Sequence, residues 1–301
     1  MIKLPSGLEI NNLIEELRIL SWKAADILLY YSQILKDGGN NSNILKNSNE
    51  ADPVTIADLE VNKLIIQGIK KKYQDISWEI LSEENVKLST QKCLNSDWIW
   101  ILDPLDGTKD FLQGTSNYAM HLALNYKQKP YIGIVLIPER DELWISYGEN
   151  IWCETRKKSI VKPNQIKNKS LKEMTLVTSK NHNNKTLENL IDKISFKKVI
   201  IMGSIGCKIT SILRGEADIY ICLSLPGKTS PKDWDFAAPH ALLESFGGAI
   251  TNINNKELTY ANSNFQQGGI IIASNNNLSH EDVCLEIKEI IEKYNLYPLN
   301  N

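Results

Sequence analysis

The first part of the chain has an apolar pattern with helical periodicity. Between residues 13 and 35, apolar side chains recur every three or four positions, which places them on one face of a helix. They are Leu13, Leu17, Leu20, Ala24, Leu28, Tyr31 and Leu35. The turn-forming residues from Asp37 to Ser42 predict the end of this helix. A second helix is predicted from about Ala57 to Lys71.

From Trp98 onward the pattern becomes that of strands. The run Trp98–Leu102 is apolar throughout, which is typical of a strand covered on both faces. Further strands are predicted at Ala119–Leu124, Tyr131–Ile137, Glu142–Tyr147, Met174–Val177, Val199–Met202, Ala217–Cys222 and Gly269–Ala273. Helices are predicted at about Ile205–Leu213, Phe236–Phe246 and Glu281–Tyr294. We therefore expect a layered α/β protein, with an α+β half at 1–160 and an α/β half at 161–301 that form one compact unit.

Composition and charge limit the classes of partner. The 301 residues are 42% hydrophobic and 23% charged, with a formal net charge of −2 and interspersed signs. Such a charge distribution produces no positive electrostatic field that would attract a polyanion, so we expect no nucleic-acid partner. No segment has the ~18 apolar residues of a membrane span, and the first twenty residues lack a signal-peptide core. Five widely spaced cysteines indicate reduced thiols. The sequence thus predicts a cytoplasmic protein without a membrane partner.

The strongest chemical signal follows the apolar run at 98–102. There the chain continues Asp103-Pro104-Leu105-Asp106-Gly107-Thr108. Pro104 fixes φ, and we expect the rigid turn to aim both carboxylates at one point. Converging carboxylates suit a hard cation such as Mg²⁺. Gly107 offers a backbone N–H that a phosphate can approach, and the Thr108 hydroxyl could orient a water. The hexapeptide therefore predicts a metal-dependent site for a phosphate ester.

Further acidic residues lie at the ends of predicted elements. Asp58 stands at the start of the second helix, where the helix dipole favours an acid. Glu83 and Glu84 follow a short apolar run. Asp235 precedes Pro239, and we expect this proline near a helix start. Each residue alone is compatible with a structural role, but with the hexapeptide they provide what a two-metal phosphoryl-transfer centre needs.

Several blocks of the chain fit a known pattern together. They are Asp-Pro-Val-Thr-Ile-Ala-Asp at 52–58, Ser-Glu-Glu at 82–84, the hexapeptide at 103–108, and Trp-Asp-Phe-Ala-Ala at 234–238 with a following Gly-Gly. In this order they resemble the inositol monophosphatase superfamily of lithium-sensitive, Mg²⁺-dependent phosphatases, over about residues 10–275. Thr-Lys-Asp-Phe at 108–111 is similar to Thr-Lys-Glu-Phe of the 3′(2′),5′-bisphosphate nucleotidases, with Asp110 in place of Glu. The resemblance implies the layered αβαβα sandwich of the sugar phosphatases.

The resemblance also implies a set of metal ligands. Glu83, Asp103 and the carbonyl of Leu105 would bind one Mg²⁺, and Asp103, Asp106 and Asp235 would bind a second. A third ion is compatible with the pattern. The residues implied in attack by a metal-activated water are Asp58 and Thr108, while backbone N–H groups of Gly107 and Thr108 would hold the phosphate.

Substrate contacts are implied mainly in the second half. The segments 179–182 and 203–208 are similar to nucleotidase blocks that contact the nucleotide, although Lys180 replaces an arginine. The implied contact residues are Ser179, His182, Ser204, Lys208 and Asp235. The first-choice substrate is adenosine 3′,5′-bisphosphate, a small phosphate monoester that would be hydrolysed to AMP and phosphate by a monomer or weak homodimer. His121, His240 and His280 lie in no such block, and we expect them to be structural.

Other functions fit the residues less well. An inositol monophosphatase or another sugar-phosphate phosphatase of the same superfamily stays open as an alternative. A haloacid-dehalogenase mechanism would use the first aspartate of Asp-x-Asp as a nucleophile, but two residues separate Asp103 from Asp106. A non-catalytic nucleotide-binding protein could use Gly227-Lys228-Thr229 as half of a P-loop, but Cys222 stands where the first glycine is needed.

Overall fold

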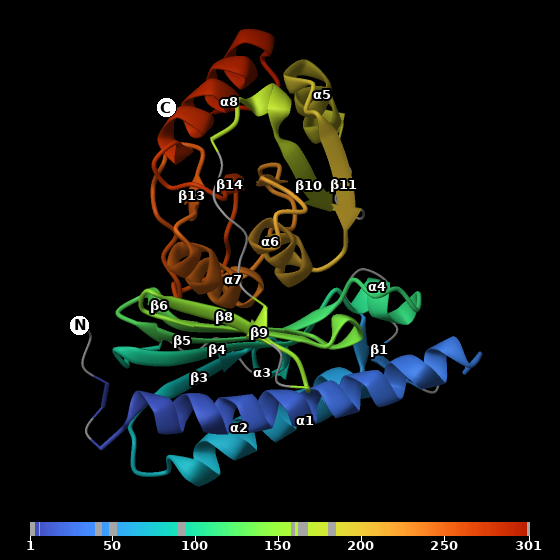
Figure 1. Ribbon diagram of the computed structural model, residues 1–301, viewed down its shortest axis with the longest axis vertical. Helices are drawn as coiled ribbons and strands as arrows, with labels where there is room; N and C mark the ends of the chain where they lie inside the picture. The colour runs from blue at the N-terminus through green and yellow to red at the C-terminus, as the bar shows by residue number, and fades with distance from the viewer. Residues whose placement is uncertain are drawn as a thin grey trace.

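Five layers make up the fold in the computed structural model, alternating between helices and sheets (Figure 1). α1 (Ile10–Lys36) and α2 (Ile56–Lys72) cover one face of a seven-stranded sheet. α6 (Ile205–Leu213) and α7 (Asp233–Phe246) lie between this sheet and a five-stranded one. α5 (Lys185–Ile194) and α8 (His280–Tyr294) cover the outer face of the five-stranded sheet. The structure describes residues 4–5, 7–39, 44–47, 53–88, 94–157, 160–161, 168–179 and 185–299.

The seven-stranded sheet follows the order of the sequence. Its strands are β3 (Glu79–Ser82), β4 (Trp98–Asp106), β5 (Ala119–Tyr126), β6 (Lys129–Ile137), β7 (Glu142–Tyr147), β8 (Asn150–Glu154) and β9 (Ile160–Val161). β3 and β4 are parallel, and the later pairs are antiparallel. Two short helices, α3 (Glu83–Leu88) and α4 (Thr108–Leu112), start where β3 and β4 end. β1 (Leu45–Asn47) and β2 (Val54–Thr55) form a separate pair, and a 3-10 turn spans Pro138–Arg140.

The five-stranded sheet is mixed. Its order is β11 (Lys198–Met202), β10 (Thr175–Ser179), β12 (Ile219–Leu223), β14 (Ile270–Ser274) and β13 (Ala249–Asn252). β10 is parallel to both neighbours, whereas β14 is antiparallel to both of its own. A 3-10 turn at Leu171–Glu173 leads into β10. The two sheets fall on either side of residues 162–174, and the division into halves at residue 160 stays a prediction.

The first five residues of β4 are all apolar because the two faces of the strand enter different cores. Trp98, Trp100 and Leu102 pack with α1 and α2, while Ile99 and Ile101 pack in the core that contains α6 and α7. Side chains alternate between faces along a strand, so the residue after Leu102 points toward the layer of α6 and α7. The sheet thus delivers the first residue of the acidic hexapeptide to the middle of the molecule.

The predicted elements are largely confirmed, with differences at their ends. β4 runs on to Asp106 instead of stopping at Leu102. α7 begins at Asp233, so Pro239 lies inside this helix and not close to its start. α5 was not predicted, although Leu187, Leu190 and Ile194 have helical spacing. The short helices α3 and α4 were not predicted either. The strands that were not predicted all have five residues or fewer; they are β1, β2, β3, β8, β9 and β13.

The cysteines and the helices of the described residues bear on the predicted reduced thiols and on the predicted lack of a membrane span. Cys153, Cys207, Cys222 and Cys284 are free cysteines, and Cys93 lies outside the described part of the chain. Within that part, no helix combines the length and the apolar character that a membrane crossing requires.

Candidate active site

A β-bulge at the end of β4 brings Asp103 and Asp106 to one face of the sheet. Asp103 pairs with His121 of β5 and Asp106 pairs with Ala119, so three steps along β4 match two along β5. Residues three apart in a regular strand point to opposite faces, and the extra residue of the bulge cancels this alternation. Asp103 Oδ1 accepts the backbone N–H of Leu105 at 3.0 Å, which closes the turn. The Leu105 side chain packs on the other face, toward α1 and α2.

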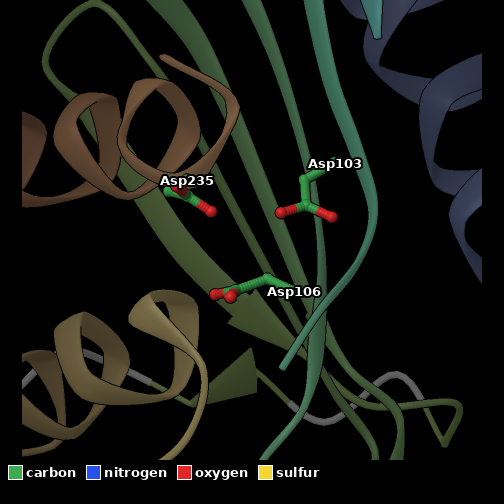
Figure 2. Close-up of side chains that lie close together, drawn as sticks. All are labelled: Asp103, Asp106 and Asp235. Atoms are coloured by element: carbon green, nitrogen blue, oxygen red, sulfur yellow. The ribbon is translucent and has the colours of Figure 1, made fainter. Parts of the chain in front are cut away.

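Asp235 meets these two aspartates from the first turn of α7. Its Oδ2 accepts the backbone N–H of Lys232 at 2.6 Å, as the third residue of a helix often does for the residue before the helix. Carboxylate oxygens of Asp103, Asp106 and Asp235 lie within 4.8 Å of one another. Figure 2 shows the three side chains converging on a common space from β4 and α7. The predicted ligands of the second ion are therefore brought together.

The start of α6 holds Asp106 in place. Asp106 Oδ2 accepts the Ser204 hydroxyl at 2.7 Å and the backbone N–H groups of Ile205 and Gly206. A helix N-terminus favours a negative charge, because its first N–H groups lack partners within the helix. Ser204 Oγ also accepts the N–H of Cys207 and thereby caps α6. Asp106 thus joins the first sheet to the helix layer.

Glu83 reaches the site because β3 and β4 are parallel. Ser82 pairs with Leu102, so the residues that follow both strands emerge at the same edge of the sheet. Glu83 is hydrogen-bonded to Asp103 and forms an ion pair with Lys87, whose Nζ lies 3.0 Å from Glu83 Oε1. Burial raises the pKa of Glu83 to about 7, although Lys87 opposes this.

Asp58 is the third residue of α2 and forms a capping box with Thr55. Its Oδ2 accepts the backbone N–H of Thr55 at 2.8 Å and also the Thr55 hydroxyl. Burial raises the pKa of Asp58 to about 8, and the charges of Glu83 and Glu84 contribute to the increase. The carboxylate of Asp58 is therefore close enough to that of Glu83 for the charge of one to raise the pKa of the other.

The converging carboxylates fit a divalent cation. Burial, and then the charges of Glu83, Asp106 and Asp235, raise the pKa of Asp103 well above its usual range. The pKa of Asp235 rises in the same way, through burial and the charge of Asp106. Such carboxylates retain protons without a cation and release them when one binds. Because every ligand atom is oxygen, the site suits a hard ion such as Mg²⁺.

The turn after β4 requires glycine. Gly107 has φ +90°, and an added Cβ would lie 2.8 Å from the Asn117 carbonyl oxygen and 3.3 Å from the Ser204 nitrogen. This close approach places Gly107 against the start of α6. The next residue, Thr108, donates its hydroxyl to the Leu105 carbonyl at 3.0 Å. The assignment of both residues to phosphate binding and water orientation stays a prediction.

Two of the side chains predicted to contact the substrate are hydrogen-bonded to other residues of the protein. Ser204 is fully buried and bonded to Asp106, and Lys208 is 1% exposed. The Lys208 ammonium donates to the Gly203 carbonyl and lies 5.3 Å from the ring centroid of Tyr220.

The other predicted contacts lie at or beyond the end of β10. Ser179 is its last residue, hydrogen-bonded to Tyr220. His182 lies outside the described residues. Contact of Ser179, His182, Ser204 and Lys208 with a substrate stays a prediction.

Two residues near the site were missed by sequence reasoning. His121 lies opposite Asp103 on β5, with Nε2 3.3 Å from Asp106 Oδ2. Asp233 accepts the backbone N–H of Ala261 and the side-chain amide of Gln267, which fixes a distant segment to the start of α7. No motif indicated either residue; their positions follow from strand register and from the docking of α7.

Comparisons with known proteins agree with this geometry. The model of the inositol monophosphatase family matches residues 11–292. The 3′(2′),5′-bisphosphate nucleotidase CysQ of Buchnera aphidicola is 32% identical over 209 residues, covering 69% of this chain and 74% of the relative. 3′(2′),5′-Bisphosphate nucleotidase 1 of Dictyostelium discoideum is 27% identical over 278 residues, covering 79% and 86%. A solved inositol monophosphatase of Thermotoga maritima superposes with a TM-score of 0.70 at 23% identity, covering 94% and 99%.

Proposed function

The chain belongs to the inositol monophosphatase family, and we propose that it hydrolyses the 3′-phosphate of adenosine 3′,5′-bisphosphate to give AMP and phosphate. The observation that carries the proposal is the convergence of Asp103, Asp106 and Asp235, whose oxygens lie within 4.8 Å of one another. The similarity to relatives named bisphosphate nucleotidases supports the choice of substrate. Lys109, directly after the hexapeptide, matches the lysine of the nucleotidase block Thr-Lys-Glu-Phe and would add a positive charge near the phosphate.

Mg²⁺ is the cofactor that fits these ligands. Glu83, Asp103 and the Leu105 carbonyl would hold one ion, and Asp103, Asp106 and Asp235 would hold a second. Bound Mg²⁺ supplies the positive charge that polarises a phosphate ester and makes a water more acidic. Asp103 would contribute to both sites, which is consistent with the charges of Glu83, Asp106 and Asp235 all acting on its carboxylate.

Asp58 is our candidate for the group that accepts a proton from the attacking water. Both Thr55 hydrogen bonds reach Oδ2 of Asp58, so they fix the orientation of the carboxylate. Burial raises the pKa of Asp58 to about 8 in the metal-free protein. The positive charge of bound Mg²⁺ would favour the ionised carboxylate, which is the form that can accept a proton near neutral pH. Thr108 would orient the water through its hydroxyl oxygen, and backbone N–H groups of Gly107 and Thr108 would bind the phosphate.

A phosphate-release panel tests the proposal. The purified protein is assayed with Mg²⁺ on adenosine 3′,5′-bisphosphate, its sulfated precursor 3′-phosphoadenosine 5′-phosphosulfate, inositol 1-phosphate and fructose 1,6-bisphosphate. We expect the highest kcat/KM for adenosine 3′,5′-bisphosphate, with AMP as the product and loss of activity in chelator. Preference for inositol 1-phosphate or fructose 1,6-bisphosphate would move the protein to the sugar-phosphate branch of the family.

Two controls separate the mechanism from the choice of substrate. Asp103→Asn keeps the shape of the side chain but removes its charge, so turnover should disappear while the unfolding transition remains cooperative. Millimolar Li⁺ should inhibit the wild-type enzyme by competing at the Mg²⁺ site. Near-normal activity of the Asp103→Asn variant would remove this residue from the cation site.

A further inference from the structure

His121 occupies a central place among the carboxylates. It is fully buried on β5, where it pairs across the strands with Asp103. Its Nε2 lies 3.3 Å from Asp106 Oδ2. Its Nδ1 lies 3.3 Å from the carbonyl oxygen of Trp234, the residue before Asp235 in the first turn of α7. The imidazole of His121 therefore lies against both segments that carry the aspartates of the cluster, the end of β4 and the first turn of α7.

The chemistry of the two neighbours fixes the role of each ring nitrogen. A carbonyl oxygen only accepts, so Nδ1 must carry the hydrogen in its bond to Trp234. Within the described part of the chain Nε2 has no hydrogen-bond partner, and Asp106 Oδ2 already accepts three donors at the start of α6. With the hydrogen on Nδ1, a neutral ring turns the Nε2 lone pair toward the Asp106 carboxylate 3.3 Å away, so the ring does not attract this carboxylate but limits how far it can turn.

The start of α6 is adapted to this ring. A Cβ on Gly206 would lie 2.2 Å from His121 Nε2 and 2.9 Å from Cδ2, distances that no side chain can occupy. The ring is thus held between the first turn of α6, the bulge of β4 and the first turn of α7. Removing it would leave a space directly behind Asp106 and free the Trp234 carbonyl.

We propose that His121 is a positioning residue for the cation site, which sets the spacing of Asp106 and Asp235 through its ring and its bond to the Trp234 carbonyl. This inference rests on the proposed function, because it presumes that the carboxylates bind Mg²⁺. Outer groups that orient metal ligands typically contribute a factor of about 10–100 to metal affinity. The same order of loss is expected when the ring is removed.

Metal binding to the chelator-treated protein, measured by titration calorimetry with Mg²⁺ and with Mn²⁺, tests the proposal without depending on activity. We expect His121→Ala to weaken binding by about tenfold or more. His121→Asn keeps a donor for the Trp234 carbonyl, so it should recover part of the affinity. Gly206→Ala would push a methyl group against the imidazole, and also against Val135 Cγ1, 2.8 Å from the added Cβ. It should also weaken binding, which provides a second variant if His121→Ala does not fold.

His280→Ala is a matched control for loss of stability. His280 is likewise buried and hydrogen-bonded, to Thr251 and Ser274, but it lies in α8 on the outer face of the five-stranded sheet. This variant should lose thermal stability and keep wild-type metal affinity. If His121→Ala also binds metal within twofold of wild type, the inference fails while the proposed function stands. If the wild-type protein binds neither ion, both fail.

Discussion

Ser204→Ala separates two roles for one hydroxyl. Sequence reasoning assigns Ser204 to the substrate, whereas the structure shows it bonded to Asp106 at 2.7 Å and capping α6 through the N–H of Cys207. Loss of an N-cap typically costs about 1 kcal/mol, and loss of a hydrogen bond to a charged group costs about 1.5–3 kcal/mol. Because Asp106 keeps two backbone donors, we expect the free energy of unfolding to fall by about 3 kcal/mol.

Urea unfolding in the presence of chelator measures this loss directly. Glycine retains most of the N-cap preference of serine, so Ser204→Gly should be about 0.7 kcal/mol more stable than Ser204→Ala while losing the same bond to Asp106. The difference between the variants isolates the cap from the carboxylate contact. If Ser204→Ala unfolds within about 0.5 kcal/mol of wild type while KM rises, the hydroxyl acts on the substrate and the structural reasoning is refuted.

Three other predictions follow from the site. The folded-state pKa values of Asp58 and Glu83, about 8 and about 7, lie above the ordinary values of 3.8 and 4.5, so their stabilising contribution to the metal-free protein is complete below about pH 4 and is lost as pH rises through 7 to 8. Mg²⁺ competes with these protons, so the increase in melting temperature on adding Mg²⁺ should grow from about pH 6 to about pH 8; a pH-independent increase would contradict the shifts. Asp233→Ala leaves the N–H of Ala261 and the amide of Gln267 without their acceptor, and urea unfolding should show a loss of about 2–4 kcal/mol, whereas a loss below about 0.5 kcal/mol would place the anchor elsewhere. Gly107→Ala combines a positive φ with a contact 2.8 Å from the Asn117 oxygen, so kcat/KM should fall at least about tenfold, and unchanged kinetics would show that the turn can rearrange.

The sequence was sufficient for the elements with strong periodicity. The long amphipathic stretch of α1 and the fully apolar start of β4 reflect burial patterns that any fold must satisfy, and both are confirmed. The family blocks identified the correct superfamily, which the match over residues 11–292 confirms. The acidic hexapeptide also predicted the convergence of Asp103 and Asp106. The rigid turn at Pro104 does not explain it alone, because the β-bulge between the two residues is also needed to bring them to one face.

Register and docking could not be predicted from one chain. The bulge is defined by the pairing of β4 with β5. In an unbroken antiparallel register Asp106 would lie opposite residue 118 of the neighbouring segment, but it pairs with Ala119 instead. Lys208 is buried because α6 lies between the two sheets. From the sequence alone this lysine was expected to contact the substrate, but in the structure its side chain is inside the protein, over the ring of Tyr220. His121 has no sequence signal at all, since its importance comes from three segments that meet around it.

The hydrogen bond from Ile205 to Asp106 has a consequence for folding order. It joins residues 99 positions apart in the chain, so the acidic cluster cannot close until the helix layer has docked on the first sheet. Contacts between distant segments carry a large loop-closure cost and tend to form late. Metal uptake should therefore follow the assembly of the core, and its rate during refolding would record the final docking step.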